Sequence, residues 1–327
     1  MKSTRGFFRP FAMCALSLFL CFLLPGLICA QEFPTRAITL YCGYDAGAGT
    51  DLTARTLAVE AEKILGVTIV VENKPGGGST VCAGVVASKK GDGYTLGLGS
   101  SQVITASPHL MTLSYNPLKD FTPVMQYSYY VSGLVVLNDS PFKTIQDLIA
   151  YAKNHPGMSY GSTGMYGQSH LSTAQLAKCK GLQLKHVPFK GGAAVATALL
   201  GNHVDMATSG DRCINYVKKG VMRLLVNYNI EKRDPSFPAV PILTELGCRD
   251  IPPNRIFIFA PKGLPDSVSM KLSEAFKKAS ETPKFQKILK DLDLPYGFKD
   301  RSQLEKELPE EYEFLKTFFN EIGVKRG

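Results

Sequence analysis

Apolar runs rich in β-branched residues alternate with amphipathic segments along most of the chain. In the first third this pattern predicts strands at Ala37–Cys42, Thr68–Val71 and Tyr94–Gly99 and helices at Asp51–Leu65 and Ser79–Lys89. Turns that contain glycine or proline join these segments. Such alternation predicts an α/β fold with a mainly parallel, doubly wound sheet.

A second series of the same kind follows, and it indicates a second α/β domain. Thr144 and Asp147 have the spacing of a capping box at the start of one of its helices. The series comprises strands at Gly133–Leu137, Met158–Gly161, Leu184–Pro188 and Val204–Thr208 and helices at Ile145–Asn154, Ser169–Lys180 and Ala193–Leu200.

Helical periodicity dominates the C-terminal part of the chain. Helices are expected at Ser267–Ser280, Pro283–Asp291 and Ser302–Ile322, where they should cover the sheet of one domain. Pro309 lies inside the last helix and should kink or divide it.

The first thirty residues have the three-part pattern of a secretory signal peptide. Basic residues precede an uncharged run at Phe11–Leu24, and Pro25 breaks that run. Cleavage is expected after Ala30, which makes residues 1–30 the signal peptide and the mature protein periplasmic. The run is short for a membrane anchor, and no later apolar run approaches membrane length.

Charge and cysteine usage narrow the choice of partners. The formal net charge is +9, three of the basic residues belong to the leader, and no patch interleaves basic with aromatic residues. A nucleic-acid partner is therefore not expected. The five cysteines after the leader fit neither a CxxC pair nor a zinc site, so no metal is expected. Disulfides can form in an oxidising compartment, with Cys42 to Cys82 as a candidate pair, and an odd count leaves at least one thiol free. The five are Cys42, Cys82, Cys179, Cys213 and Cys248.

Several predicted strands run into short loops of small residues that open helices. Backbone N–H groups in such loops can approach a ligand closely, and the helix dipole favours an anion. Because ligands bind at the carboxyl ends of strands in open α/β sheets, these loops are candidate anion sites. Asp51 follows the first loop and can cap its helix. The loops are Tyr44–Thr50, Gly99–Ser101 and Gly161–Gly167.

Signatures of catalysis are weaker than these loops. Gly47-Ala48-Gly49 resembles the start of a nucleotide-binding motif, but Leu52 stands where the third glycine belongs. The chain has no Gly-x-Ser-x-Gly elbow and no His-Glu-x-x-His motif. Neither an enzymatic activity nor a cofactor is expected.

Motifs spread over essentially the whole mature chain resemble those of the tripartite tricarboxylate transporter receptors, also called Bug proteins. Many motifs in the right order carry more weight than any single glycine pair. They occur at Phe33–Arg36, 46–51, Ala54–Arg55, Val71–Gly76, Asp92–Leu96, Asp147–Lys153, Tyr160–Gly164, His170–Leu171, His186–Gly191 and Val240–Pro241.

The resemblance implies a type II periplasmic-binding fold, in which two α/β domains joined by crossing hinge strands close on a ligand. The chain should leave the first domain near Gly133–Leu137 and return near Arg255–Phe259. This gives a discontinuous domain I at 31–134 and 255–327 and a domain II at 135–254.

The resemblance also implies a monomeric receptor that holds a small organic carboxylate with backbone donors and ordered waters. It would deliver that ligand to the integral membrane subunits of a tripartite transporter driven by an ion gradient. The residues expected at the ligand are Tyr44, Asp45, Ala46, Gly47, Gly49, Thr50, Ser100, Ser101, Ser162, Thr163, Tyr166, Gly167, Gln168, His170, Lys190 and Asp211.

Two departures from the family pattern affect the expected ligand. Asp45 stands in a carboxylate-binding loop where the family has a small or neutral residue, so it either points away or recognises a cationic group of the ligand. Tyr166 and Gly167 stand where the family has Gly and then Ser or Thr. The sequence leaves a periplasmic sensing module that feeds a signalling partner as an alternative function, and a secreted hydrolase as a lesser one.

Overall fold

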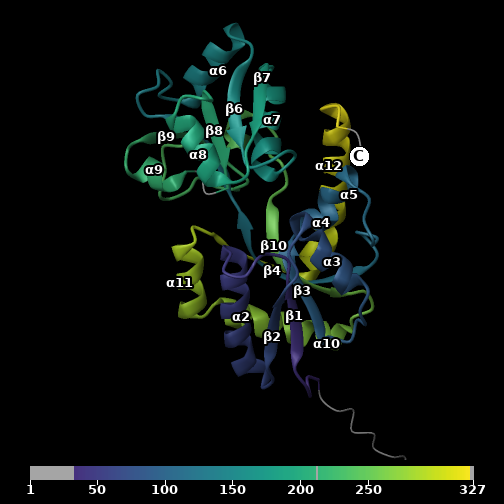
Figure 1. Cartoon of the computed structure of the whole chain (residues 1–327). Coiled ribbons are helices and arrows are strands. Elements are labelled where there is room, and N and C mark those ends of the chain that lie inside the picture. Colours follow the sequence, from purple (N-terminus) through teal and green to yellow (C-terminus); the bar gives the residue numbers. More distant parts are fainter. Residues whose placement is uncertain (1–32, 211–212, 325–327) are drawn as a thin grey trace, which may run out of the picture.

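The computed structural model describes residues 33–210 and 213–324, which form two β-sheets flanked by helices (Figure 1). Each sheet and the helices that pack on it form one sheet unit. The first sheet has the order β11-β4-β10-β3-β1-β2, with β1 (Ile38–Cys42), β2 (Ile69–Asn73), β3 (Thr95–Ser100), β4 (Phe121–Tyr130), β10 (Asn254–Pro261) and β11 (Tyr296–Asp300). The second has the order β7-β6-β8-β5-β9, with β5 (Ser132–Leu137), β6 (Met158–Ser162), β7 (Leu184–Pro188), β8 (Met206–Ser209) and β9 (Met222–Tyr228).

The expected α/β class is confirmed, but both sheets are mixed, so the expectation of a mainly parallel first sheet is wrong. The strands of the predicted βαβ units pair in parallel, β1 with β2 and β3, and β6 with β7 and β8. The pairs that involve β4, β5, β10 and β11 are antiparallel. The sequence pattern missed β4, β9, β10 and β11, of which β10 was expected only from the family resemblance. Antiparallel strands of this kind need no crossover helix to join them.

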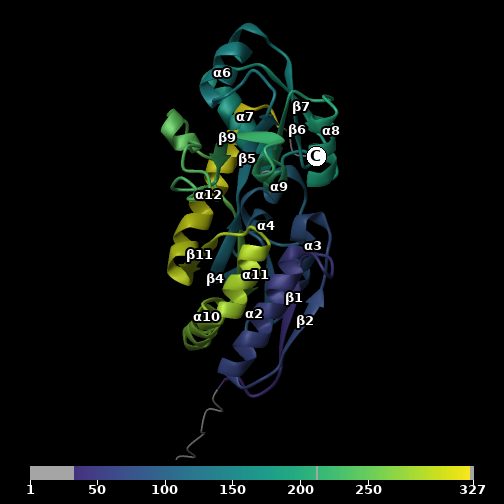
Figure 2. The same ribbon diagram turned by 90° about the vertical axis from the view of Figure 1, so that its left-hand side faces the viewer.

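The chain crosses between the sheets at Val131, the single residue between β4 and β5. It returns to the first sheet through β10, which pairs with both β3 and β4. Figure 1 shows the chain passing between the two sheet units through these strands, and Figure 2 gives the side view, in which α12 extends from the first unit toward the second.

The helices of the first sheet unit pack on both faces of its sheet. On one face α2 (Gly49–Leu65), α10 (Asp266–Ser280) and α11 (Pro283–Asp291) enclose a core that includes Leu57, Phe276 and Phe285. On the other face α3 (Thr80–Ala87) and α12 (Arg301–Glu321) pack against Phe257 and Phe259. Two short helices precede β4, namely α4 (Gln102–Thr105) and α5 (Ser107–Leu110). The C-terminal helices therefore cover the first sheet, as predicted.

Helix α12 begins at a capping box formed by Asp300 and Gln303 and continues through Pro309 without a break. The expected division of this helix is therefore wrong. Its last turns reach the second sheet unit, where Phe318 and Phe319 pack against Leu171. Figure 1 shows the upper end of α12 beside that unit.

The second sheet unit carries α6 (Ile145–Asn154), α7 (Gln168–Lys180), α8 (Gly192–Leu200) and α9 (Ile214–Lys218). The predicted capping box at the start of α6 is confirmed, because Asp147 N donates to the Thr144 side chain and Thr144 N donates to the Asp147 carboxylate. Leu148 and Ala152 of this helix face the core that also contains Val226.

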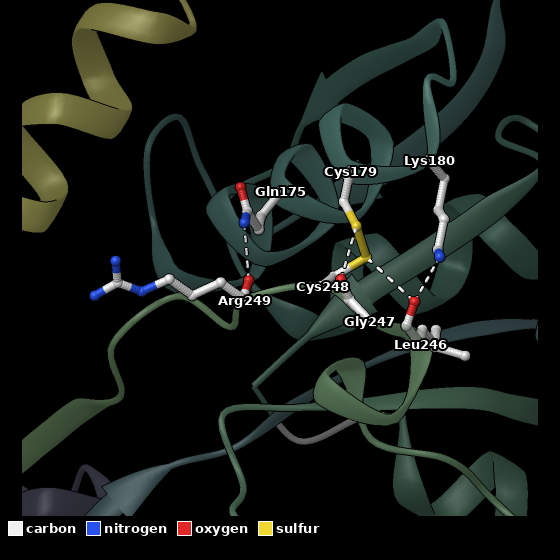
Figure 3. The surroundings of a disulfide bond; sticks show 7 residues. All are labelled: Gln175, Cys179, Lys180, Leu246, Gly247, Cys248 and Arg249. Carbon is white, nitrogen blue, oxygen red and sulfur yellow. Dashed lines mark hydrogen bonds between the residues drawn. A yellow bond between two sulfur atoms is a disulfide. The ribbon is translucent and has the colours of Figure 1, made fainter.

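A disulfide joins Cys179, in the last turn of α7, to Cys248, and the two Cα atoms lie 5.8 Å apart (Figure 3). The Gln175 amide donates to Arg249 O and the Lys180 ammonium donates to Leu246 O, which holds the same two segments together. The candidate pair Cys42 to Cys82 is wrong, because both are free thiols. They belong to the cores on opposite faces of the first sheet.

Candidate functional site

The loop between β1 and α2 leaves the first turn of that helix open to a ligand. The N-cap residue Ala48 has an extended backbone and makes no side-chain hydrogen bond to the helix. The first N–H groups of a helix have no intrahelical partner. Those of Gly49 and Thr50 are therefore available to an acceptor outside the helix.

Asp51 is the third residue of α2 and supports this loop from behind. It does not occupy the N-cap position as expected. Its side chain is 2% exposed, and it accepts hydrogen bonds from Gly47 N at 2.9 Å, Arg55 Nε at 3.0 Å and Asn73 Nδ2 at 2.7 Å. Burial alone would raise the pKa of Asp51, but the bonds from Arg55, Gly47 and Asn73 lower it. Asp51 therefore stays ionised and holds the loop in place.

Hydroxyl groups line the base of the same loop. Thr50 Oγ1 and the Tyr130 hydroxyl lie 2.5 Å apart, which joins the start of α2 to the end of β4. Burial raises the pKa of Tyr44, although hydrogen bonds with the neighbouring hydroxyls of Tyr130, Ser79 and Ser100 oppose that rise. Burial also raises the pKa of Tyr130. These groups remain neutral and serve as hydrogen-bonding partners.

The loop between β6 and α7 has the same construction. Its N-cap residue, Gly167, has an extended backbone and no side-chain cap. His170 is the third residue of α7, and its Nδ1 accepts a hydrogen bond from Tyr166 N at 2.9 Å. Thr163 Oγ1 lies 2.8 Å from Ser169 Oγ, which fixes the start of the loop. Both loops thus bind a backbone N–H four residues upstream through the third residue of the helix.

A cleft of about 380 Å³ lies between these loops and has walls from both sheet units. The first unit contributes the start of α2, the end of β4 and the segment after α11. The second contributes the loop after β6 and the start of α8. The lining residues are Tyr44, Ala48, Gly49, Thr50, Tyr130, Thr163, Gly192, Gly210, Leu292, Asp293 and Leu294. Among these described residues none is a lysine, arginine or histidine, so they offer backbone N–H and hydroxyl groups to an anion.

The residues expected at the ligand divide into three groups. Those that line the cleft are Tyr44, Gly49, Thr50 and Thr163. A second group supports the cleft without lining it. In the first unit, Gly47 donates to Asp51, and Ser100 and Ser101 bond to Asn254 and Arg255 of β10. In the second unit, Ser162 contacts His186, Gly167 caps α7, and Gln168 donates to Pro252 O. The remainder lie elsewhere, with Asp45, Ala46 and Lys190 exposed and Tyr166 and His170 lining a different cavity. Asp211 lies outside the described residues.

The sequence argument missed the rest of the lining. Gly191 and Gly192 follow β7 and open α8, which is the same small-residue pattern as in the other loops. That pattern could have identified Gly192. Tyr130 and the segment Leu292–Leu294 come close to the cleft only through the tertiary fold, and no local signal marks them.

Two further properties concern the described part of the chain, residues 33–210 and 213–324. It contains no helix that is long and apolar enough to cross a membrane. It also contains no group of three or more His, Cys, Asp or Glu side chains placed to hold a metal ion.

The fold and the cleft define a two-domain α/β binding protein, and comparison with known proteins agrees. The sequence profile described as tripartite tricarboxylate transporter family receptor, TctC, matches residues 53–324. A relative from Cupriavidus necator, the UPF0065 protein in the gbd 5' region, is 37% identical over 93% of each chain. The chain therefore belongs to the tripartite tricarboxylate transporter receptor family, a class of periplasmic solute-binding proteins.

Two solved structures of relatives match the whole fold. A ligand-free TctC solute-binding protein from Polaromonas is 26% identical and superposes with a TM-score of 0.80, over 88% of this chain and 99% of the other. MatC from Rhodopseudomonas palustris with bound malate is 27% identical and superposes with a TM-score of 0.67, over 88% and 99% of the two chains.

Proposed function

We propose that this chain is an extracytoplasmic receptor that captures a small organic carboxylate in the cleft and delivers it to the membrane subunits of a tripartite transporter. The observation that carries this proposal is the cleft itself, where the uncapped start of α2 faces the loop after β6 and the start of α8. Uncapped helix starts favour negative charge. The bound malate of MatC supports a carboxylate as the ligand class.

Capture requires the two sheet units to approach each other. We propose that they move as two domains, one containing β1–β4, β10 and β11 and the other β5–β9, about the crossing strands near Val131 and β10. Small-angle scattering should show a smaller radius of gyration on malate addition, and no change at saturation contradicts closure.

The role of the α2 N-terminus can be tested by removing one N–H group. Gly49→Pro deletes the donor at the first helical position, where proline is well tolerated. The extended backbone of Ala48 suits a residue before proline. Gly49→Ala is the matched control, because its Cβ would lie 3.6 Å from Leu292, an ordinary contact, while the N–H remains.

The expected result is a clear difference between these two variants. Calorimetric titration with malate should show about tenfold weaker binding for Gly49→Pro, because a hydrogen bond to a charged group contributes about 1.5 kcal/mol or more. Gly49→Ala should stay within about threefold of the unchanged protein. Equal affinities for both variants would exclude the α2 N-terminus as the carboxylate site.

A further inference from the structure

A second cavity of about 490 Å³ lies beside α7 and shares no lining residue with the cleft. Most of its wall comes from the second sheet unit, through β6, β7 and α7. Ile322 and Val324, at and beyond the end of α12, close it from the other side. The cavity contains Tyr166 and His170, which sequence reasoning had assigned to the ligand cleft.

Stacked aromatic rings form one wall of this cavity. The ring centroids of Tyr166 and His170 are 5.6 Å apart, and those of His170 and His186 are 3.8 Å apart with nearly parallel planes. Tyr160 extends the wall at 5.0 Å from His186. Because the stacked faces of His170 and His186 cover each other, the ring edges with their nitrogens are the parts that a ligand can reach.

The hydrogen bonds of His170 determine what it offers to the cavity. His170 is 8% exposed. Burial is the main cause that lowers the pKa of His170 to about 4, and the neighbouring His186 is the second. The ring is therefore neutral at physiological pH. Because Nδ1 accepts from Tyr166 N, the proton of the neutral ring must be on Nε2. No residue of the described chain accepts from that Nε2–H, which leaves a donor at a cavity wall.

His186 presents the opposite polarity. Its Nε2 lies 2.7 Å from Ser162 Oγ, and this hydroxyl also donates to Gly164 O at 3.1 Å. Because the hydroxyl hydrogen of Ser162 is used in that bond, Ser162 Oγ accepts from His186 Nε2–H. Nδ1 of the His186 ring then carries no hydrogen and is an acceptor. Burial lowers the pKa of His186 as well. The stacked pair thus offers one donor and one acceptor on adjacent rings.

We propose that this cavity is a second binding site, which takes an uncharged planar group with a donor beside an acceptor, such as an aromatic carboxamide. The carbonyl would accept from His170 Nε2–H and the amide N–H would donate to His186 Nδ1. Leu182, Leu184 and Val324 supply apolar contacts for the rest of the ligand.

An anionic ligand fits this cavity poorly. The charged residue in its lining, Lys178, already pairs with Glu321 at the end of α12. A carboxylate would therefore lose its water without gaining a cation from the described lining, and burial of such a charge is costly. This preference separates the cavity from the carboxylate cleft.

The test uses benzamide as the probe and protein labelled with ¹⁵N in its histidines. Titration should shift the ring signals of His170 and His186 in a saturable manner and leave those of His109, His155 and His203, which do not line the cavity, unchanged. Benzoate should bind at least about tenfold more weakly than benzamide. Absence of saturable shifts at both rings, or equal binding of the two probes, overturns the proposal.

A cavity-filling variant tests the location without altering the histidines. Ala177→Phe places a ring in the cavity from α7 and should weaken benzamide at least about tenfold. The matched control Ala150→Phe makes the same substitution on the exposed face of α6 and should stay within about twofold. Unchanged benzamide affinity in Ala177→Phe would show that the probe binds elsewhere. Malate titration of the same variants reports on the cleft, so failure here is distinct from failure of the receptor function.

Discussion

The two helix-opening loops are built alike, yet they direct their side chains to different places. In each, the third residue of the helix accepts the backbone N–H four residues upstream, Asp51 from Gly47 and His170 from Tyr166. Gly47 has no side chain, so the first loop presents the start of α2 to the cleft. Tyr166, at φ 56°, stacks its ring on His170 beside the second cavity. The residue whose backbone N–H is bound, Gly47 in the first loop and Tyr166 in the second, therefore determines how much of each loop faces the cleft.

The two sheet units also differ in how a carboxylate is paired. Asp51 is ionised and pairs with Arg55. In the second unit, the partly buried carboxylate of Asp250 accepts hydrogen bonds from the backbone N–H groups of Asn229 and Ile251 instead. Burial raises the pKa of Asp250 to about 6. Asp51 is therefore stabilised by a cation, whereas Asp250 is held by backbone N–H groups.

The largest expected effect comes from the disulfide. Replacing Cys179 and Cys248 together by alanine should lower the free energy of unfolding by about 4 kcal/mol, because the bond closes a loop with a sequence separation of 69. Guanidinium denaturation of the variant and of the reduced parent protein should agree. Hydrogen exchange should quicken in α7 and not in α2. Equal quickening in both helices would show that the two units do not respond separately.

The support behind the first loop should matter somewhat less. Asp51→Ala removes three hydrogen bonds from a buried carboxylate and should lower the free energy of unfolding by about 3 kcal/mol. Arg55→Ala should cost about 1 kcal/mol, because its side chain is half exposed. Chemical denaturation measures both. A loss for Arg55→Ala as large as that for Asp51→Ala would mean that the ion pair, and not the bond to Gly47, supports the loop.

The pH dependence of stability should separate two groups of the second unit. The pKa of Asp250 is raised to about 6 on folding, so its contribution to stability is lost as the pH rises from about 4 through 6. The pKa of His170 is lowered to about 4, so its contribution is lost as the pH falls from 6.5 through 4. The two effects have opposite signs and offset each other in the same window.

Asp250→Asn should reveal the His170 effect by removing the offset. The free energy of unfolding of this variant should rise by about 2 kcal/mol more between pH 4 and 6 than that of the parent protein. Denaturation at a series of pH values measures the slope. The same slope in both proteins would show that Asp250 does not bind a proton on folding in this range.

Local patterns predicted most of the strands and helices, but not the way in which the site is assembled. The helical period and the capping residues predicted both ends of α6 and of α11 correctly, since Thr144 with Asp147 and Thr282 with Pro283 are local signals. The strand β4 was missed, because Phe121–Tyr130 lies between β11 and β10, and its nearly continuous buried run shows no alternation.

The candidate site was predictable only where the chain itself marks it. Small residues at the start of a helix identified Gly49 and Thr50, and backbone geometry alone makes such positions suitable for an anion. Orientation could not be predicted in the same way, since Tyr166 and His170 turn aside because His186 lies on a neighbouring strand. Pairing of Cys179 with Cys248 likewise depends on the fold that brings α7 to the segment after β9.

The smallest expected effect concerns Asp45, the exposed residue of the first loop. Its backbone carbonyl accepts from Ala48 N, and its side chain is not among those that line the cleft. A charge in water is well screened at this position, so Asp45→Ala should change malate affinity by less than about twofold. If the side chain instead turned toward the ligand on closure, the substitution would remove a like-charge contact and tighten malate about fivefold. Calorimetric titration of both proteins at low and high ionic strength distinguishes the two outcomes, because only a direct contact within the closed cleft would persist at high salt. A fivefold gain at both salt concentrations would therefore add Asp45 to the residues that select the ligand of the cleft.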